Sequence, residues 1–382
     1  MTIEIFKTLS TSDNFPFGNS LESFFNKYTI KESIECYNFF CDPSGSGTSL
    51  KDLERIKYSK DIIIWVAVDS LLTTKPYNYY TDKKIDFLYE LEEICRRNKD
   101  KKFILFCSQH SLQKFVSISN LFITDLINLH LPQQYKHCDT KNLDSSPWIC
   151  LNSGAESHKF AIISYLIGKQ FDKNGKLCID KSFSNSKKDF KKSLDLFQFD
   201  VFQKKIVSQG FENFLKEKFI RSTLPPYSGN NLNNYQNNLI SIYQTTVLEI
   251  VVGSLFFEPM PFFGEKEIQC IYGKNLPIFI NAPGSVEIFR EKFGFDMFDD
   301  IIDHSYDSIE DPSIRIFKAI DNNEHLLRND KLLHTIWSKN KKRFTKNCKK
   351  LDKFLFDKNF QINFDEKNIK KAFDYFKISY SN

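Results

Sequence analysis

Residues 243–315 read YQTTVLEIVVGSLFFEPMPFFGEKEIQCIYGKNLPIFINAPGSVEIFREKFGFDMFDDIIDHSYDSIEDPSIR, and this stretch decides the fold. Residues 246–255 are β-branched and apolar, which predicts a strand, and residues 276–281 (LPIFIN) predict a second strand. Residues 264–272 carry apolar side chains at helical spacing, and residues 286–293 predict another helix after the second strand. A strand–helix–strand–helix series with short loops is typical of a parallel sheet.

The turn after the second strand, APGS at 282–285, has the residues expected before a helix. Ser285 is the predicted N-cap, because its hydroxyl can accept a hydrogen bond from the first helical turn. Gly294 is the predicted end of that helix, in the left-handed conformation that glycine adopts without strain.

Charged side chains stand where such a unit binds ligands, at the carboxyl edge of the sheet. Helix N-termini at this edge present free N–H groups and a partial positive charge, which favours phosphate. Lys266 adds a full positive charge at the start of the first helix, and Glu265 offers a carboxylate that ribose hydroxyls can donate to.

The ordered motifs of this stretch resemble those of viral and bacterial glycosyltransferase-like proteins. The motifs are GEK at 264–266, LPIFINAPGS at 276–285, GFDMFDDIID at 294–303, HSYDSIED at 304–311 and Arg315. The Glu-Lys signature is also similar to that of fucosyltransferases with the GT-B fold. A second match, WICLNSGAESHKFAIISYL at 148–166, resembles the family's strand and helix with a His-Arg pair. Together the matches cover roughly a quarter of the chain.

The resemblance implies two Rossmann-like α/β domains, GT-B-like, that face a cleft, with the donor bound in the second half. The implied reaction moves a sugar from a nucleotide-diphosphate sugar to an acceptor hydroxyl on a glycan or on a hydroxymethylated base in viral DNA. The implied transfer needs no metal and no resident cofactor, and retaining and inverting chemistry both stay open. The expected donor-site residues are Asn152, His158, Lys159, Glu265, Lys266, Gly284, Ser285 and Tyr306.

Simpler structural roles stand beside these assignments. Asn152, His158 and Lys159 cluster at a strand-to-helix turn, where they could form a helix cap with a surface lysine. Tyr306 could pack in the core, with Asp307 capping the helix that starts near Pro312.

The chain departs from the family pattern at three places. Gly264 stands where the family has Thr or Ser, Lys159 follows His158 where the family has Arg, and no acidic residue stands near Gly253. The alternative to an active enzyme is therefore a catalytically degenerate binding or structural protein of the same fold.

The first half of the chain also alternates between strand and helix patterns. Residues 61–69 and 102–107 predict buried parallel strands, residues 85–97 a helix between them, and residues 112–131 further helical material. We expect an acceptor-side domain over residues 1–146.

Two residues of this half are candidate general bases. Asp69 and His110 each follow a predicted strand, and either side chain could take the proton of an acceptor hydroxyl. The alternative places Asp69 at a helix cap and His110 in a polar turn.

The second half, residues 147–382, is the predicted nucleotide-sugar-binding domain with a C-terminal helical extension. Residues 172–200 are polar and rich in Lys and Ser, which indicates a surface excursion, and residues 201–219 predict a helix. Residues 227–238 are an Asn-rich connector without predicted regular structure.

Composition bounds the class of protein. The sequence has 39 Phe and nine Cys, and the cysteines are scattered, which favours reduced and mostly buried thiols over a disulfide framework or a zinc site. The N-terminus lacks the features of a signal peptide, and the apolar run at 62–68 is too short to span a bilayer. We expect a soluble cytoplasmic protein, in the host-cell cytoplasm if the chain is viral.

The net charge of +5 is concentrated near the C-terminus. Residues 328–353 hold ten Lys and Arg against two Asp, in a pattern that predicts an amphipathic helix with one basic face. This helix is predicted to be either a C-terminal helix with a solvated face or a contact for a polyanion such as DNA or an acidic glycan.

Overall fold

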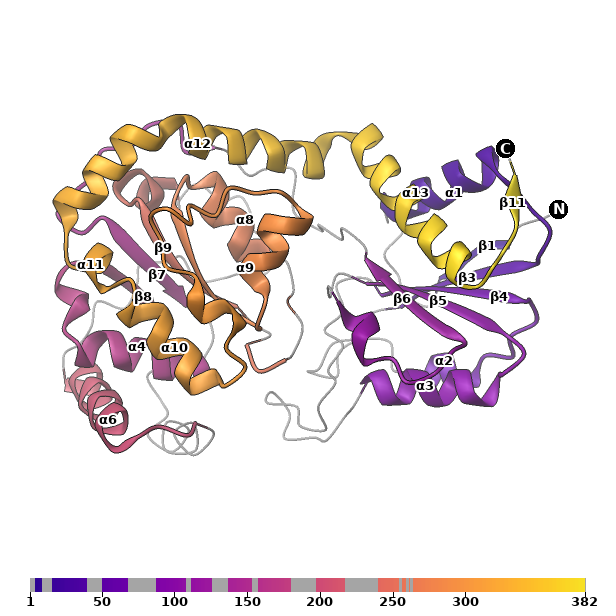
Figure 1. Cartoon of the computed structure of the whole chain (residues 1–382), viewed down its shortest axis with the longest axis horizontal. Helices are drawn as coiled ribbons and strands as arrows, with labels where there is room; N and C mark the ends of the chain where they lie inside the picture. Colours follow the sequence, from indigo (N-terminus) through magenta and orange to yellow (C-terminus); the bar gives the residue numbers. More distant parts are fainter. Residues whose placement is uncertain are drawn as a thin grey trace. The chain divides into compact units, whose positions relative to one another are not determined.

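The computed structural model (Figure 1) gives the arrangement of most of the chain. The residues that it describes are 4–8, 16–39, 50–67, 87–107, 111–125, 137–152, 157–179, 197–216, 240–253, 256–258, 261 and 264–381. Contacts divide the chain into two compact units, each with its own sheet. The first unit comprises Met1–His130, Glu258–Phe263 and Asp352–Asn382, and the second comprises Leu131–Phe257 and Gly264–Leu351.

The first unit is built on a parallel sheet in the strand order β1-β3-β4-β5-β6. The strands are β1 (Glu4–Thr8), β3 (Ile34–Phe39), β4 (Ile62–Ala67), β5 (Lys102–Cys107) and β6 (Leu121–Asp125). The predicted strands at 61–69 and 102–107 are confirmed as β4 and β5. The prediction of helical material over 112–131 is wrong in part, because within the described residues 112–125 only the short 3₁₀ turn η1 (Leu112–Phe115) is helical and β6 follows it.

Helices cover both faces of the first sheet. One face packs on α2 (Leu50–Arg55) and α3 (Phe87–Arg97) through an apolar core that includes Trp65 and Phe103. The other face packs on α1 (Pro16–Lys27) and α13 (Lys358–Tyr375). A short antiparallel pair, β2 (Thr29–Ile30) with β11 (Tyr380–Ser381), adds to this side. The C-terminal helix therefore belongs to the core of the first unit.

The second unit is built on a parallel sheet in the order β10-β9-β7-β8. The strands are β7 (Trp148–Asn152), β8 (Lys176–Ile179), β9 (Leu248–Val252) and β10 (Leu276–Ile280). β7, β9 and β10 confirm three predicted strands. β8 lies within the predicted surface excursion at 172–200, and that prediction is wrong for residues 176–179, which pair with β7.

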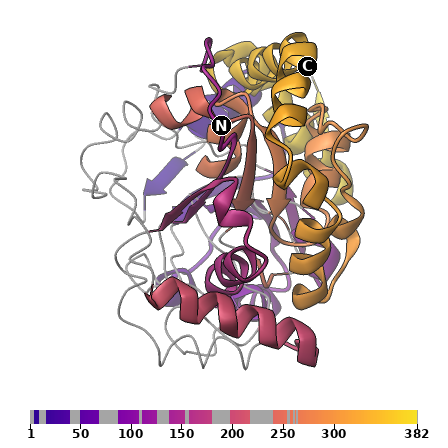
Figure 2. The same ribbon diagram turned by 90° about the vertical axis from the view of Figure 1, so that its left-hand side faces the viewer.

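Helices lie on and around the second sheet. They are α4 (Ser157–Gly168), α6 (Val201–Lys216), α8 (Glu265–Tyr272), α10 (Pro312–Asp321), α11 (Glu324–Leu327) and α12 (Asp330–Phe356). Side chains from α4, α6, α10, α11 and α12 share one large apolar core with alternate residues of the strands, such as Trp148, Cys150 and Ile250. Figure 2 shows α6 as the outermost layer on the α4 side.

The turn after β10 differs from its prediction in detail. Helix α9 covers only Ser285–Glu287 and continues as the π-helical turn η4 (Ile288–Lys292). Gly284, with φ 77°, is the N-cap residue, so the prediction of Ser285 as the N-cap is wrong. Gly294 has φ 66°, which confirms its left-handed conformation after the helix.

The two compact units do not follow the ranges expected for the acceptor-side and donor-side domains. The contacts place residues 131–146 with the second sheet and Asp352–Asn382 with the first. Lys141 is one reason for the first placement, because its buried amino group donates to Tyr243 O and to Asn275 Oδ1 at the amino edge of the second sheet. The functional division of the chain at residue 146 stays a prediction.

Two general expectations concern cysteines and membranes. Seven cysteines in the described ranges are buried thiols outside any disulfide: Cys36, Cys95, Cys107, Cys138, Cys150, Cys270 and Cys348. None of the helices within those ranges combines the length and the apolar character needed to cross a bilayer.

Candidate functional site at the carboxyl edge of the second sheet

The strand order of the second sheet creates a topological switch point between β7 and β9. From β7 the chain passes through α4 to β8 on one side, and from β9 it passes through α8 to β10 on the other side. Connections that leave two neighbouring strands in opposite directions separate their loops, and open α/β sheets bind ligands at this place. A ligand site is therefore expected at the carboxyl ends of β7 and β9.

Asn152, the last residue of β7, lies at this edge and is only 1% exposed. Its Nδ2 lies 3.1 Å from Cys150 Sγ, and its Oδ1 has no hydrogen-bond partner among the described residues. Cys150 belongs to the core that α4 shares, and residues two apart in a strand point to the same face, so Asn152 faces α4. A buried acceptor without a partner costs about 1–3 kcal/mol, and a ligand donor would recover this cost.

His158 lies in the first turn of α4 and joins β7 to β9. Its Nε2 lies 2.9 Å from the carbonyl oxygen of Gly253, the residue that follows β9. A carbonyl only accepts hydrogen bonds, so Nε2 carries a proton and donates it. The imidazole also stacks on Phe256, with 5.0 Å between ring centroids and 12° between planes. His158 thus fixes the two segments that leave the switch point.

Lys159, the next residue, is 2% exposed, so the alternative of a surface lysine is wrong. A lysine is almost never fully buried without a partner for its charge. Lys159 lies in the first turn of α4, directly after His158, in the helix that follows the strand ending at Asn152.

Lys266, in the first turn of α8, reaches back to the same edge. Its Nζ donates to Val252 O, the last residue of β9, at 3.1 Å. The backbone of Glu265 begins α8, and its side chain lies outside the described residues, so its contact with ribose stays a prediction. Glu267 closes the helix start, because its Oε2 accepts from Gly264 N at 3.0 Å.

Gly253, near which the resembling proteins have an acidic residue, is closely packed against the segment after β10. A Cβ atom on Gly253 would lie 2.1 Å from Cγ of Asn281, which follows β10. Asn281 itself is held by Glu267, whose Oε1 accepts from Asn281 Nδ2 at 3.2 Å. A side chain at position 253 would therefore displace a packed amide.

The loop that carries Gly284 and Ser285 lies after β10 at the same edge, but several of its hydrogen-bond donors already have partners within the protein. Asp307 accepts from Val286 N and Glu287 N, each at 3.0 Å, and its carbonyl oxygen accepts from Gly284 N at 2.8 Å. Ser285 Oγ donates to Ala282 O at 2.7 Å. A protein carboxylate thus stands where a phosphate was expected. Burial raises the pKa of Asp307, and its two backbone hydrogen bonds oppose that shift.

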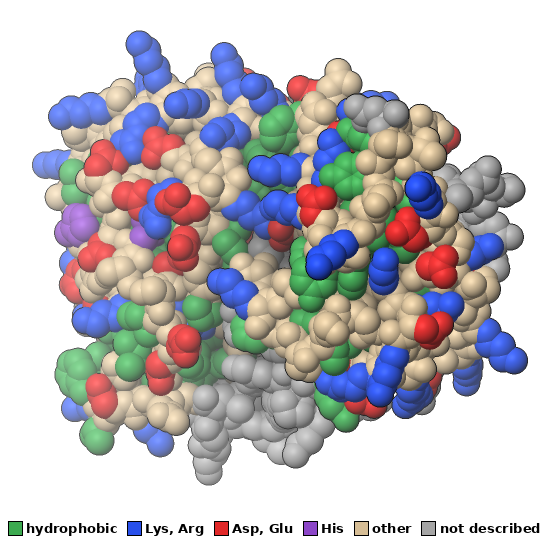
Figure 3. All heavy atoms as spheres, turned by 45° about the vertical axis from the view of Figure 1, so that its right-hand side comes forward, with side chains coloured by type: hydrophobic (Ala, Val, Ile, Leu, Met, Phe, Trp, Pro, Cys, Tyr) green, Lys and Arg blue, Asp and Glu red, His purple; other side chains and the backbone are tan. Residues whose placement is uncertain are grey.

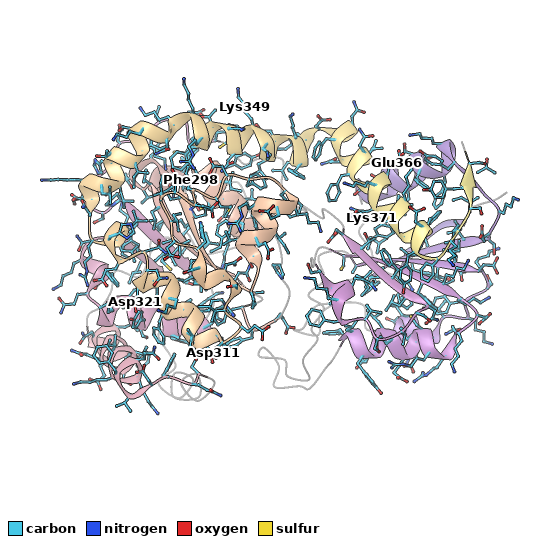
Figure 4. The ribbon with its side chains drawn as sticks, viewed as in Figure 1. Phe298, Asp311, Asp321, Lys349, Glu366 and Lys371 are labelled. Atoms are coloured by element: carbon cyan, nitrogen blue, oxygen red, sulfur yellow. The ribbon has the colours of Figure 1, made fainter. Side chains whose placement is uncertain are left out.

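Tyr306 is completely buried beside this carboxylate. Its hydroxyl lies 3.3 Å from His304 Nδ1, while His304 Nε2 donates to Met297 O at 2.8 Å. The burial favours the packing role for Tyr306. The predicted cap of α10 by Asp307 is wrong, because Asp311 is the N-cap and accepts from Ile314 N at 2.9 Å (Figure 4).

Arg315 is a site residue whose role sequence reasoning missed, although it stood in the quoted motif. Its guanidinium is 2% exposed and donates to Phe256 O, Ile309 O and Glu310 O at 2.7, 2.6 and 3.0 Å. It also lies over the Phe256 ring, 4.6 Å from the centroid. Phe256 therefore links Arg315 to His158, so two motifs about 150 residues apart in the chain meet here.

The candidate bases Asp69 and His110 lie outside the described residues, so their roles stay predictions. In the described ranges no group of three or more His, Cys, Asp or Glu side chains is arranged to hold a metal ion.

No protein-family profile matches the sequence, and no curated protein matches it as a relative.

Proposed function

We propose that the protein is a glycosyltransferase that binds a nucleotide-diphosphate sugar at the switch point of the second sheet. The observation that supports this proposal is the convergence of Asn152, His158 and Lys266 on the carboxyl ends of β7 and β9. The unpaired acceptor Asn152 Oδ1, the amino group of Lys266 and the N-terminus of α4 together suit a ligand that has both hydroxyl groups and phosphates.

Each of these residues has a distinct role in the proposed reaction. The acceptor hydroxyl oxygen attacks the anomeric carbon, the bond from that carbon to the phosphate oxygen breaks, and the diphosphate departs with the electron pair. Lys266 and the N-terminus of α4 stabilise the negative charge that develops on the diphosphate. Asn152 Oδ1 accepts a hydrogen bond from the nucleotide sugar, and His158 positions the loop after β9.

The proton of the acceptor hydroxyl passes to a general base of the first half, for which Asp69 and His110 are the candidates. Glu265 is assigned to the nucleoside on the resemblance alone. Gly284, Ser285 and Tyr306 have a lesser place in the proposal than the sequence suggested, because Asp307 holds the N–H groups of that loop.

A GT-B-like organisation of the whole chain belongs to the same proposal. Each unit has a parallel sheet, and the C-terminal helix α13 packs on α1 and on the sheet of the first unit. The resemblance implies such a return of the C-terminal helix to the N-terminal domain.

Lys266→Met tests the donor site by calorimetry with uridine and guanosine diphosphates. Loss of a charged hydrogen bond to phosphate should weaken nucleotide binding by about 1.5–3 kcal/mol. Lys318→Met, an exposed lysine on α10, is the matched control and should bind as the unmodified protein does. Equal affinities for both variants, or no nucleotide binding by the unmodified protein, would overturn the assignment.

The rival function is a degenerate binding protein, and the packing of Gly253 on Asn281 favours it, since no acidic side chain fits there. Incubation with a mixed pool of nucleotide sugars separates the two. Mass spectrometry that detects bound nucleotide sugar without hydrolysis or transfer supports the rival, whereas release of the nucleotide diphosphate supports the enzyme.

A further inference from the structure

Helix α12 presents a straight row of lysines on its outer side. The row consists of Lys339, Lys342, Lys346 and Lys349, all exposed and separated by three, four and three residues. This spacing places the four side chains on one face of the helix over about 15 Å of its axis. Lys349 projects from the outer side of α12 in Figure 4, and Figure 3 shows Lys and Arg side chains gathered at the same upper side of the molecule.

The opposite face of α12 is fixed in the core of the second unit. Leu333, Trp337 and Phe344 are buried there, and the ring of Phe344 lies 4.7 Å from that of Phe298. The helix therefore cannot turn its lysines inward, and the row is a fixed feature of the surface.

The described residues compensate the charges of the row only weakly, through the proximity of Lys346 to the carboxylate of Asp296. The nearby acidic residues pair with Arg343 on the flank of the helix, which forms salt bridges with Asp296 and Asp300 at 2.6 and 2.7 Å. None of the four lysines forms a salt bridge with any residue that the structure describes. Four like charges so close together repel one another unless an external anion joins them.

The form of the row favours a nucleic-acid backbone over a membrane. A helix that binds the lipid interface buries an apolar face there, and the apolar face of α12 already lies in the protein core. Thr335 and Ser338, which precede Lys339 on the same exposed face, are polar. A phosphodiester strand presents one charge every 3.4 Å of axis, about four or five over the length of the row.

We propose that the lysine row of α12, Lys339, Lys342, Lys346 and Lys349, binds the phosphate backbone of a nucleic acid without sequence specificity. Lysines act as point charges toward phosphates and do not read bases in a fixed geometry. The donor site is not needed for this binding, so the inference stands or falls separately from the proposed transferase activity.

Fluorescence anisotropy with a labelled 20-base-pair DNA duplex and a 20-nucleotide single strand, each from 50 to 200 mM salt, tests the proposal. Four phosphate contacts predict a slope of log affinity against log salt of about −3.6 on the duplex and about −2.8 on the single strand. Duplex affinity should therefore fall about 100-fold over this range. Replacing all four lysines by Gln should remove most of the slope.

The matched control replaces four other exposed lysines, Lys99, Lys204, Lys205 and Lys318, by Gln, which changes the net charge by the same amount. The proposal expects this variant to keep the slope of the unmodified protein. Equal loss of slope in both variants would show a general charge effect and overturn it, as would failure of both nucleic acids to bind at 50 mM salt.

Two further measurements complete the design. Vesicles containing phosphatidylserine should bind much more weakly than DNA, and preferential binding to the vesicles through the same four lysines would overturn the proposal. Calorimetry with the nucleotide diphosphates should give the same affinity for the row variant as for the unmodified protein. The row variant should also keep its thermal midpoint, because all four side chains are exposed.

Discussion

Arg315 fixes the segment after β9 through a buried guanidinium that serves three carbonyl oxygens. Arg315→Met keeps much of the side-chain volume but leaves those acceptors without a donor. Each unsatisfied buried group costs about 1–3 kcal/mol, so we expect a loss of about 3 kcal/mol or more in unfolding free energy. Urea unfolding measures it, with Lys318→Met on the same helix as the control. A loss below about 1 kcal/mol would contradict this role of the Arg315 hydrogen bonds.

Asp365 on α13 is buried against α1, where its Oδ2 accepts from Ser20 Oγ at 2.6 Å. Burial raises the pKa of this carboxyl from 3.8 to about 7, and the hydrogen bond from Ser20 opposes the rise. The folded state therefore holds a proton that the unfolded state has lost between pH 4 and 7. Because the folded state binds more protons, the stability of the first unit should fall as the pH rises through this range.

Asp365→Asn tests this pH dependence, because the amide keeps an acceptor for Ser20 and does not ionise. At pH 4 the two proteins should differ little, and at pH 8 the variant should be more stable by up to about 4 kcal/mol. Hydrogen exchange of β4 at both pH values reports the stability of the first unit. A variant that is less stable than the unmodified protein at pH 8 would contradict the shift.

At the scale of elements, α4 and α6 pack at close range through two glycines. A Cβ on Gly210 would lie 1.8 Å from Ser164 O, and one on Gly168 would lie 2.3 Å from Ile206 O. These contacts are with backbone atoms, which cannot move aside as a flexible side chain can. The close approach holds α6 against the helix that carries His158.

Gly210→Ala should therefore destabilise the second unit, although alanine is the better helix former by about 1 kcal/mol. Overpacking typically costs 1–3 kcal/mol, and here it acts against a backbone oxygen, so we expect a net loss of roughly 1–3 kcal/mol. Gln209→Ala, exposed on the same helix, is the control and should leave stability unchanged or slightly higher. Thermal unfolding compares them, and a Gly210 variant as stable as the control would contradict the close packing.

The elements that were predicted well from the sequence are those whose own residues carry the whole signal, such as a run of apolar residues in a buried strand. β4, β5, β9 and β10 are buried on both faces, so their residues are almost all apolar and the strands are recognisable, although β9 includes the buried Glu249. β8 was not predicted because it is short and lies within a polar stretch. Only four of its residues pair with β7, at the edge of the sheet.

The candidate site was predictable only in part, for a similar reason. The motifs identified His158 and Lys266, which meet at the carboxyl edge of the sheet, and the quoted series included Arg315. Asp307 accepts hydrogen bonds from two N–H groups at the start of α9, although it lies 20 residues or more further along the chain. No local pattern records such a contact, so Ser285 looked like the cap.

At the scale of the whole molecule, the last helix of the chain completes the core of the first unit. Ile369, Ala372 and Phe373 of α13 are fully buried in a core that includes Ile64 and Phe106 of the first sheet. The first unit therefore cannot bury one face of its sheet until residues 358–375 have joined it. The second unit has a separate apolar core that uses no residue of α13.

Ala372→Asp should therefore unfold the first unit selectively, because it places a charge without a partner in that core. Such a burial costs several kcal/mol, on the order of 3–5, which is a large part of the stability of a domain. Hydrogen exchange should rise in β4 and β5 while β7, β9 and β10 keep their protection. Lys371→Asp is the matched control, since Lys371 is the exposed neighbour on α13 (Figure 4) and should keep both units protected. Equal loss of protection in both sheets would mean that the two units unfold as one.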